Sequence, residues 1–221
     1  MDIGFSFSFP FNDTDWLKKI LLVGLVGLIP IIGQLVVLGF MGQVIKRYLS
    51  DDAILLPDLD FGGQLSLGFK LFVVNLVYQI PAIIALLPAF IIMGIATSMA
   101  GSDNANTVIT VGYVFLLCCG GLVVLYSILV AFMLPIAFAR VVVDENIGAG
   151  FKFAEFFAIL KANLVNYLIA ILLAGFVGGI IISIGSMVCG IGVIFAIPYA
   201  LAMEGNLFGQ AYKIAQSKPT M

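Results

Sequence analysis

Apolar blocks separated by short polar connections follow one another along most of the chain. The first block, residues 16–47, contains Pro30 and Gly33 near its middle and ends at Lys46 and Arg47. As a single helix it would be about 45 Å long, against a hydrocarbon core of about 30 Å. Proline removes a backbone donor and glycine accepts a left-handed conformation, so we expect a short or re-entrant helical hairpin that turns at Pro30 and Gly33. A single kinked span is the alternative.

Three further apolar blocks cover residues 70–100, 107–139 and 162–203. The last block is long enough for two spans, and the glycines within residues 186–192 favour a turn there. Only helices or closed barrels satisfy the backbone in lipid. We therefore expect an all-α, polytopic membrane protein with about six embedded helical segments arranged as three hairpins.

Composition supports the same class. Of the 221 residues, 62% are hydrophobic and 10% are charged, whereas soluble domains are roughly 45–50% apolar and about 25% charged. We expect one membrane domain, residues 1–221. The chain has no histidine and three cysteines, so we expect no catalytic residues, no metal site, no cofactor and no enzymatic activity. The expected partners are membrane lipids, with other membrane proteins or a second copy as further candidates, and not nucleic acid.

Two segments are expected to lie at the membrane surface. In residues 1–15, four phenylalanines alternate with other residues, so an extended segment would place their rings on one side. In residues 148–161, a helix would place Phe153, Phe156, Phe157 and Leu160 on one side and Lys152 and Glu155 on another. That pattern is typical of an amphipathic surface helix.

Three polar side chains stand out within the apolar runs. Asn75 and Gln79 are four residues apart and share a helix face, which favours hydrogen bonds to a neighbouring helix. Glu204 is the one acid deep in an apolar run, and a carboxylate there costs a few kcal/mol. We consider these residues a candidate intramembrane polar site. Alternatively, Glu204 lies near the cytoplasmic end, neutral or paired with Lys46 or Lys70.

Glycines four residues apart indicate close helix packing in two places. Gly175 and Gly179 form one such pair, and Gly205 and Gly209 form the other.

The ten basic residues predict the orientation. They lie near the start of the first block, in residues 46–70 and 140–161, and in the tail, whereas the connections 101–106 and 185–192 contain none. With the first block as a hairpin, every Lys and Arg falls on one side. By the positive-inside rule we expect a multi-pass protein of the cell membrane with both termini in the cytoplasm.

Several motifs resemble a known family. The first half contains, in order, DTDWLKKILLVGL, IPIIGQLVVLGF and LPDLDF followed by Gly68, and the second half contains FKFAEFFAILKANLVNYL and IPYALAMEGNLFGQAYK. Together they resemble the prokaryotic membrane proteins grouped as domain of unknown function 4013. The resemblance implies an integral membrane protein and carries over no activity.

We expect a structural, accessory or scaffold protein of the membrane, because short hairpins, an amphipathic helix and many small residues suit that role. A small transporter, channel or lipid-translocating protein is the alternative, which the prolines in the helices and Glu204 would suit.

Overall fold

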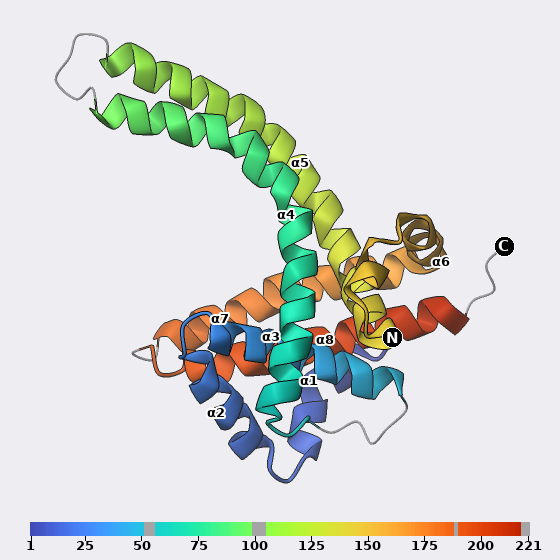
Figure 1. Ribbon diagram of the computed structural model, residues 1–221. Coiled ribbons are helices and arrows are strands. Elements are labelled where there is room, and N and C mark those ends of the chain that lie inside the picture. Colours follow the sequence, from blue (N-terminus) through green and yellow to red (C-terminus); the bar gives the residue numbers. More distant parts are fainter. Residues whose placement is uncertain (51–55, 99–104, 188–189, 218–221) are drawn as a thin grey trace. The chain divides into compact units, whose positions relative to one another are not determined.

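The chain is helical and forms two compact units (Figure 1). The computed structural model describes four stretches: 1–50, 56–98, 105–187 and 190–217. The first unit comprises Met1–Val74 and Phe132–Met221, and the second comprises Asn75–Ala131. No strand occurs in the stretches described, so the predicted all-α class is confirmed.

The first unit is built around two helices that lie side by side, α3 and α8, with α2, α6 and α7 packed against α8. Phe40 and Val44 of α3 and Ala202 of α8 are buried in its core. The unit also includes the start of α4 and the end of α5. The elements are α1 (Ile3–Ser8), η1 (Phe9–Asn12), α2 (Trp16–Gly27), α3 (Ile32–Leu49), α4 (Phe61–Ser98), α5 (Ala105–Asp144), η2 (Ile147–Phe151), α6 (Phe153–Leu172), the π-helix η3 (Leu173–Val177), α7 (Gly178–Met187) and α8 (Val193–Ser217).

The first apolar block is a helical hairpin, as predicted, but its turn is made differently. Ile31 takes φ 65° and ψ −65°, and the Ile32 N–H donates to the Pro30 carbonyl oxygen at 2.7 Å, which is a γ-turn. Gly33 was expected to supply the left-handed residue, and that prediction is wrong because Gly33 lies inside α3. A Cβ at Gly33 would lie 2.0 Å from the Val26 carbonyl oxygen, so the glycine allows α3 to approach α2.

Replacing Ile31 with glycine should stabilise the hairpin by about 1 kcal/mol, because a β-branched residue at positive φ is strained. The side chain is 78% exposed, so little packing is lost. Thermal unfolding in detergent micelles measures the effect. Ile29→Gly is the control, since Ile29 has no positive φ and glycine there should only destabilise. Equal destabilisation by both variants would contradict strain at Ile31.

The third hairpin joins α7 to α8. Gly190 takes φ 74° just before α8 begins, which agrees with the turn predicted in residues 186–192. Next to the turn, a Cβ at Gly192 would lie 2.4 Å from the Gly185 carbonyl oxygen. The two arms of this hairpin therefore meet backbone to backbone.

The N-terminal segment is helical, which corrects the expected extended conformation of residues 1–15. Asp2 caps α1 by accepting the Phe5 N–H at 2.9 Å. Phe9 is fully buried in the core, whereas Phe11 is 53% exposed. The phenylalanine rings therefore do not form one continuous face.

Hydrogen bonds between buried polar side chains join α1 to α8. Ser6 Oγ donates to Asn206 Oδ1 at 2.8 Å, and Gln210 Nε2 donates to the same oxygen at 2.8 Å. Gln210 Oε1 also accepts the Asp2 N–H at 2.6 Å. All three of Ser6, Asn206 and Gln210 are buried. The segment is thus part of the folded unit.

The predicted surface helix over residues 148–161 begins later than expected. A 3-10 turn, η2, precedes it, and α6 starts at Phe153. Phe156 is buried while Phe157 is 51% exposed, so these two rings do not share one environment. Asn163 then has φ −146° and ψ 36°, which separates the first turns of α6 from the apolar helix that follows.

The second unit consists of the later part of α4 and the earlier part of α5. The Tyr126 hydroxyl donates to the Tyr78 carbonyl oxygen at 2.7 Å, and Gly112 faces Met93, so the two helices pack against each other. Pro81 lies inside α4. Most of the expected connection over residues 101–106 falls outside the described residues.

Three helices are long and apolar enough to cross a membrane: Phe61–Ser98, Asn106–Asp144 and Asn163–Met187. The remaining predicted segments, α2, α3 and α8, are helical but are not among these three in the part of the chain described. The fold is that of a polytopic helical membrane protein.

Candidate functional site

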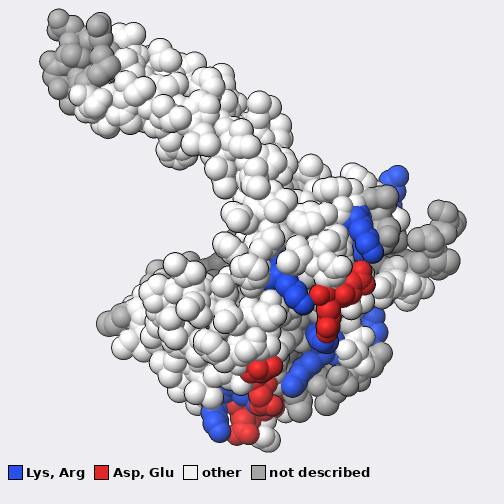
Figure 2. All heavy atoms as spheres, in the orientation of Figure 1, with Lys and Arg blue, Asp and Glu red and all other residues white. Residues whose placement is uncertain are grey.

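Charged side chains gather on one face of the first unit (Figure 2). All ten Lys and Arg residues belong to the sequence of this unit, and Asp103 is the one charged residue in the sequence of the second. The charged residues that pair come from the start of α2, the end of α3, the start of α4 and the end of α5. We call this face the polar layer.

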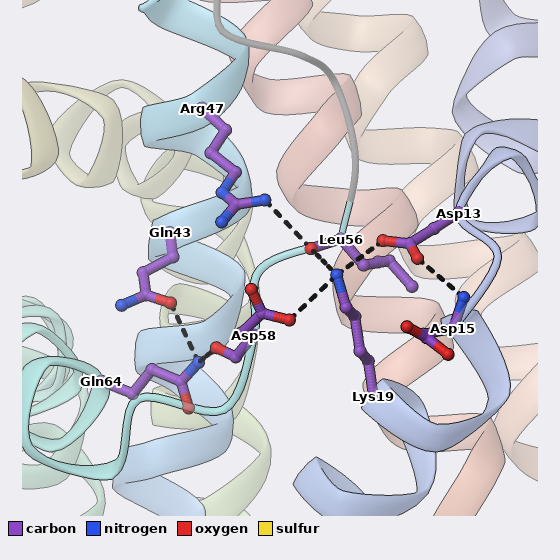
Figure 3. Close-up of polar contacts among 8 residues, drawn as sticks. All are labelled: Asp13, Asp15, Lys19, Gln43, Arg47, Leu56, Asp58 and Gln64. Atoms are coloured by element: carbon purple, nitrogen blue, oxygen red, sulfur yellow. Dashed lines mark hydrogen bonds and ion pairs between the residues drawn. The ribbon is translucent and has the colours of Figure 1, made fainter.

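Lys19 is the centre of the first cluster in the polar layer (Figure 3). Its Nζ lies 2.7 Å from Asp13 Oδ2 and 3.0 Å from Asp58 Oδ1, and it donates to the Leu56 carbonyl oxygen at 3.0 Å. The side chains of Lys19 and Asp13 are only 14% and 5% exposed, whereas Asp58 is 79% exposed. The buried pair with Asp13 is therefore the stronger contact.

The same cluster joins α3 to the segment that leads into α4. Arg47 NH1 donates to the Leu56 carbonyl oxygen at 3.0 Å, the oxygen that Lys19 also uses. Gln64 Nε2 donates to Gln43 Oε1 at 2.9 Å and to the Asp58 carbonyl oxygen at 3.0 Å (Figure 3). These contacts join four parts of the chain: the start of α2, the end of α3, residues 56–58 and the start of α4.

The Asp13–Lys19 pair shifts the pKa of both groups. Burial alone would raise the pKa of Asp13, but hydrogen bonds from Lys19 and from the Asp15 N–H hold it below its ordinary value of 3.8. Burial alone would lower the pKa of Lys19, but its bonds to Asp13 and Asp58 hold it above 10.5. Each group thus stabilises the charged form of the other.

Acid should weaken this pair. A carboxyl whose pKa is lowered by folding contributes stability above its ordinary pKa of 3.8, and that contribution disappears as pH falls through the lowered value. We expect the stability difference between the wild type and Asp13→Asn to shrink as pH falls from about 6 to about 2. Unfolding followed in detergent micelles at each pH tests this. A difference independent of pH would show that the Asp13 charge contributes nothing.

Glu145 is the centre of the second cluster. Lys46 Nζ lies 2.5 Å from Glu145 Oε1, and Lys70 Nζ donates to the Glu145 carbonyl oxygen at 2.9 Å. The hydrogen bond from Lys46 lowers the pKa of Glu145. Glu145 itself has φ 51°, a left-handed conformation that aims its side chain and carbonyl at two lysines. The ends of α3 and α5 and the start of α4 therefore converge here.

The polar residues expected to form an intramembrane site lie in different units. Glu204 is on α8 in the first unit, between the buried residues Met203 and Gly205. Asn75 and Gln79 are on α4 in the second unit, and both are half-buried.

The two glycine pairs have different surroundings. A Cβ at Gly205 would lie 2.8 Å from the Met41 carbonyl oxygen, and one at Gly209 would lie 3.1 Å from Tyr48, so this pair packs against α3. Gly175 and Gly179 are exposed, and a Cβ at either would meet nothing within 4 Å.

A tighter glycine contact, between α3 and α4, was not expected. A Cβ at Gly39 would lie 1.8 Å from the Gln64 carbonyl oxygen, and one at Gly68 would lie 1.8 Å from the Leu35 carbonyl oxygen. The backbones of the two helices are in contact at this crossing, one helical turn from the Gln43–Gln64 hydrogen bond. The two glycines are 29 positions apart, so spacing gave no sign of the pair.

The described residues contain no group of His, Cys, Asp or Glu side chains that could hold a metal ion. The polar layer consists instead of ion pairs and amide hydrogen bonds between helix ends. Such an arrangement can hold helices in register and can present charge at a membrane surface.

Three helices long and apolar enough to cross a membrane indicate an integral membrane protein of the polytopic helical class. Residues 22–191, well over half of the chain, match the model of a family described as protein of unknown function (DUF4013). The chain belongs to this family, which is the one that its motifs resemble. None of the curated proteins and none of the solved structures that were compared matches the chain.

Proposed function

We propose that this protein is an accessory or scaffold protein of the membrane that associates with other membrane proteins through its apolar helices, and that it has no catalytic role. One observation carries the proposal. In the most apolar parts of the three candidate spans, only 17%, 6% and 11% of the residues are buried within the protein.

The second unit contributes most of this uncovered surface. Its two helices pack against each other and leave large side chains such as Phe90 and Leu117 exposed, at 65% and 76%. An exposed apolar surface of this extent is covered in a membrane by lipid or by other helices. In the first unit, α3 and α8 pack against each other and helix ends are joined in the polar layer, whereas the apolar span Asn163–Met187 is also largely uncovered. These uncovered apolar helices suit association with other membrane proteins.

Purification from native membranes in a mild detergent tests the role. We expect at least one other membrane protein to co-purify in a fixed ratio with the wild type. A flux assay with the purified protein in liposomes is the counterpart, and we expect no transport above that of empty liposomes. Specific flux without a co-purifying protein would favour a transporter and contradict the proposal.

We further propose that both termini lie in the cytoplasm. Support comes from the polar layer, where basic residues from α2, α3 and α4 meet on one face of the first unit. Single cysteines at Ser8 and Ser217, in a background without Cys118, Cys119 and Cys189, test this with a membrane-impermeant reagent. Both positions are exposed in the fold. We expect neither to be labelled from outside intact cells, and labelling of either would refute the shared cytoplasmic location.

A further inference from the structure

A polar cleft opens between the end of α3, the start of α4 and the end of α5, all within the first unit. Its volume is about 260 Å³. Both signs of charge line it, together with uncharged hydrogen-bonding groups. The polar lining residues are Gln43, Lys46, Asp60, Ser66, Lys70 and Glu145.

An apolar groove of about 520 Å³ adjoins this cleft. The two hollows share Ser66 and Lys70, so they lie side by side along α4. The groove is lined mainly by hydrocarbon, and Phe69 on its wall is 52% exposed. Its other lining residues are Leu35, Gly62, Leu65 and Ile147. Two adjoining hollows, one charged and one apolar, match an amphiphile that contacts both.

The charges in the cleft suggest which headgroup would fit. Lys70 gives one of its three donors to a neutral acceptor, the Glu145 carbonyl oxygen, so two donors remain for an anion. Lys46 lines the same cleft and is neutralised by Glu145. Asp60 adds a carboxylate, whose Oδ1 accepts the Gly63 N–H at 3.0 Å. A phosphate near the lysines and an ammonium near Asp60 would satisfy both signs.

We propose that the cleft and the adjoining groove together bind a phospholipid with a zwitterionic amino headgroup, with its phosphate at Lys70 and Lys46, its ammonium at Asp60 and one acyl chain in the groove. Lipid with an amino headgroup should bind better than phosphatidylglycerol, because phosphatidylglycerol carries the same phosphate charge but has no ammonium to pair with Asp60. It should also bind better than choline lipid, because a trimethylated nitrogen cannot donate a hydrogen bond to Asp60. The site does not depend on the proposed scaffold role.

Native mass spectrometry of the purified full-length protein, titrated with phosphatidylethanolamine, phosphatidylglycerol or phosphatidylcholine, measures this binding. One variant tests the cleft and another tests the groove. Lys70→Gln removes the headgroup contact, and its control is Lys18→Gln, which removes an exposed charge outside the cleft. Gly62→Leu fills the groove, and a Cβ there meets nothing within 4 Å. Its control is Gly94→Leu, which is equally free of contacts and lies in the second unit.

We expect one phosphatidylethanolamine per chain to bind with the highest affinity, about tenfold weaker binding in Lys70→Gln, and a similar loss in Gly62→Leu. The two controls should bind as the wild type does. Equal losses in Lys18→Gln and Lys70→Gln would mean general attraction of charge and would overturn the site. Unchanged binding in Gly62→Leu would exclude the groove, and equal affinity for the three lipids would refute the headgroup assignment.

Discussion

Replacing Gly39 with alanine is expected to destabilise the first unit by about 3 kcal/mol or more. The new Cβ would lie 1.8 Å from the Gln64 carbonyl oxygen, far inside contact distance, and the obstacle is backbone rather than a flexible side chain. The crossing of α3 and α4 would have to open. The Gln43–Gln64 hydrogen bond at the same crossing should then lengthen or break.

Reversible unfolding in mixed micelles can follow this loss through the fluorescence of Trp16, the only tryptophan in the chain. Gly62→Ala, two residues before Gln64 on α4, is the matched control. Alanine there has open space, so it should be neutral or stabilise the helix by about 0.5–1 kcal/mol. If both variants unfold alike, α3 and α4 do not meet at Gly39.

Replacing Lys19 with methionine is the second large effect, with an expected loss of about 3 kcal/mol. The substitution keeps most of the side-chain volume but leaves the Asp13 carboxylate, which is 5% exposed, without its cation. It also removes the donor that ties Leu56 to α2. Equilibrium unfolding as above gives the size of the loss.

The double variant Lys19→Met, Asp13→Asn provides the control for this prediction. Removing both charges should recover part of the loss, because the cost of the single variant arises from a buried charge left unpaired. Lys18→Met, its exposed neighbour, should change stability by less than about 0.5 kcal/mol. A full, equal loss in the single and double variants would show that the pair makes no coupled contribution.

The sequence predicted the hairpins because their signals are local. Pro30 interrupts an apolar block that is too long for one span, and Gly190 and Gly192 interrupt another. The strained residue of the first turn could not be predicted, because Ile31 is an isoleucine like Ile29 and Ile32 beside it and carries no turn signal of its own. Gly33 is placed where a turn glycine belongs, yet it serves a contact with Val26.

The N-terminal segment was mispredicted for a different reason. Alternating phenylalanines favour an extended conformation, but Asp2 is a good helix N-cap and the Phe5 N–H uses it. Burial of Phe9 in the core then decides the outcome. A local capping signal together with a tertiary contact outweighed the alternation.

The polar layer could not be found from spacing. Lys46 and Glu145 are 99 positions apart and Lys70 and Glu145 are 75 apart, so they meet only through the crossing of α3 with α4 and the return of α5. The sequence showed where basic residues fall but not that they converge. The candidate set of Glu204, Asn75 and Gln79 stays a prediction, since these residues belong to separate units.

Site-specific photo-crosslinking in native membranes tests most directly whether the apolar hairpin contacts other membrane proteins. A crosslinking amino acid at Leu117, which is 76% exposed, is compared with one at Ala89, which is fully buried in the fold. Our account predicts a discrete protein adduct at Leu117 and none at Ala89. Adducts to lipid alone at Leu117, and at further exposed positions such as Phe90 and Leu125, would contradict the account.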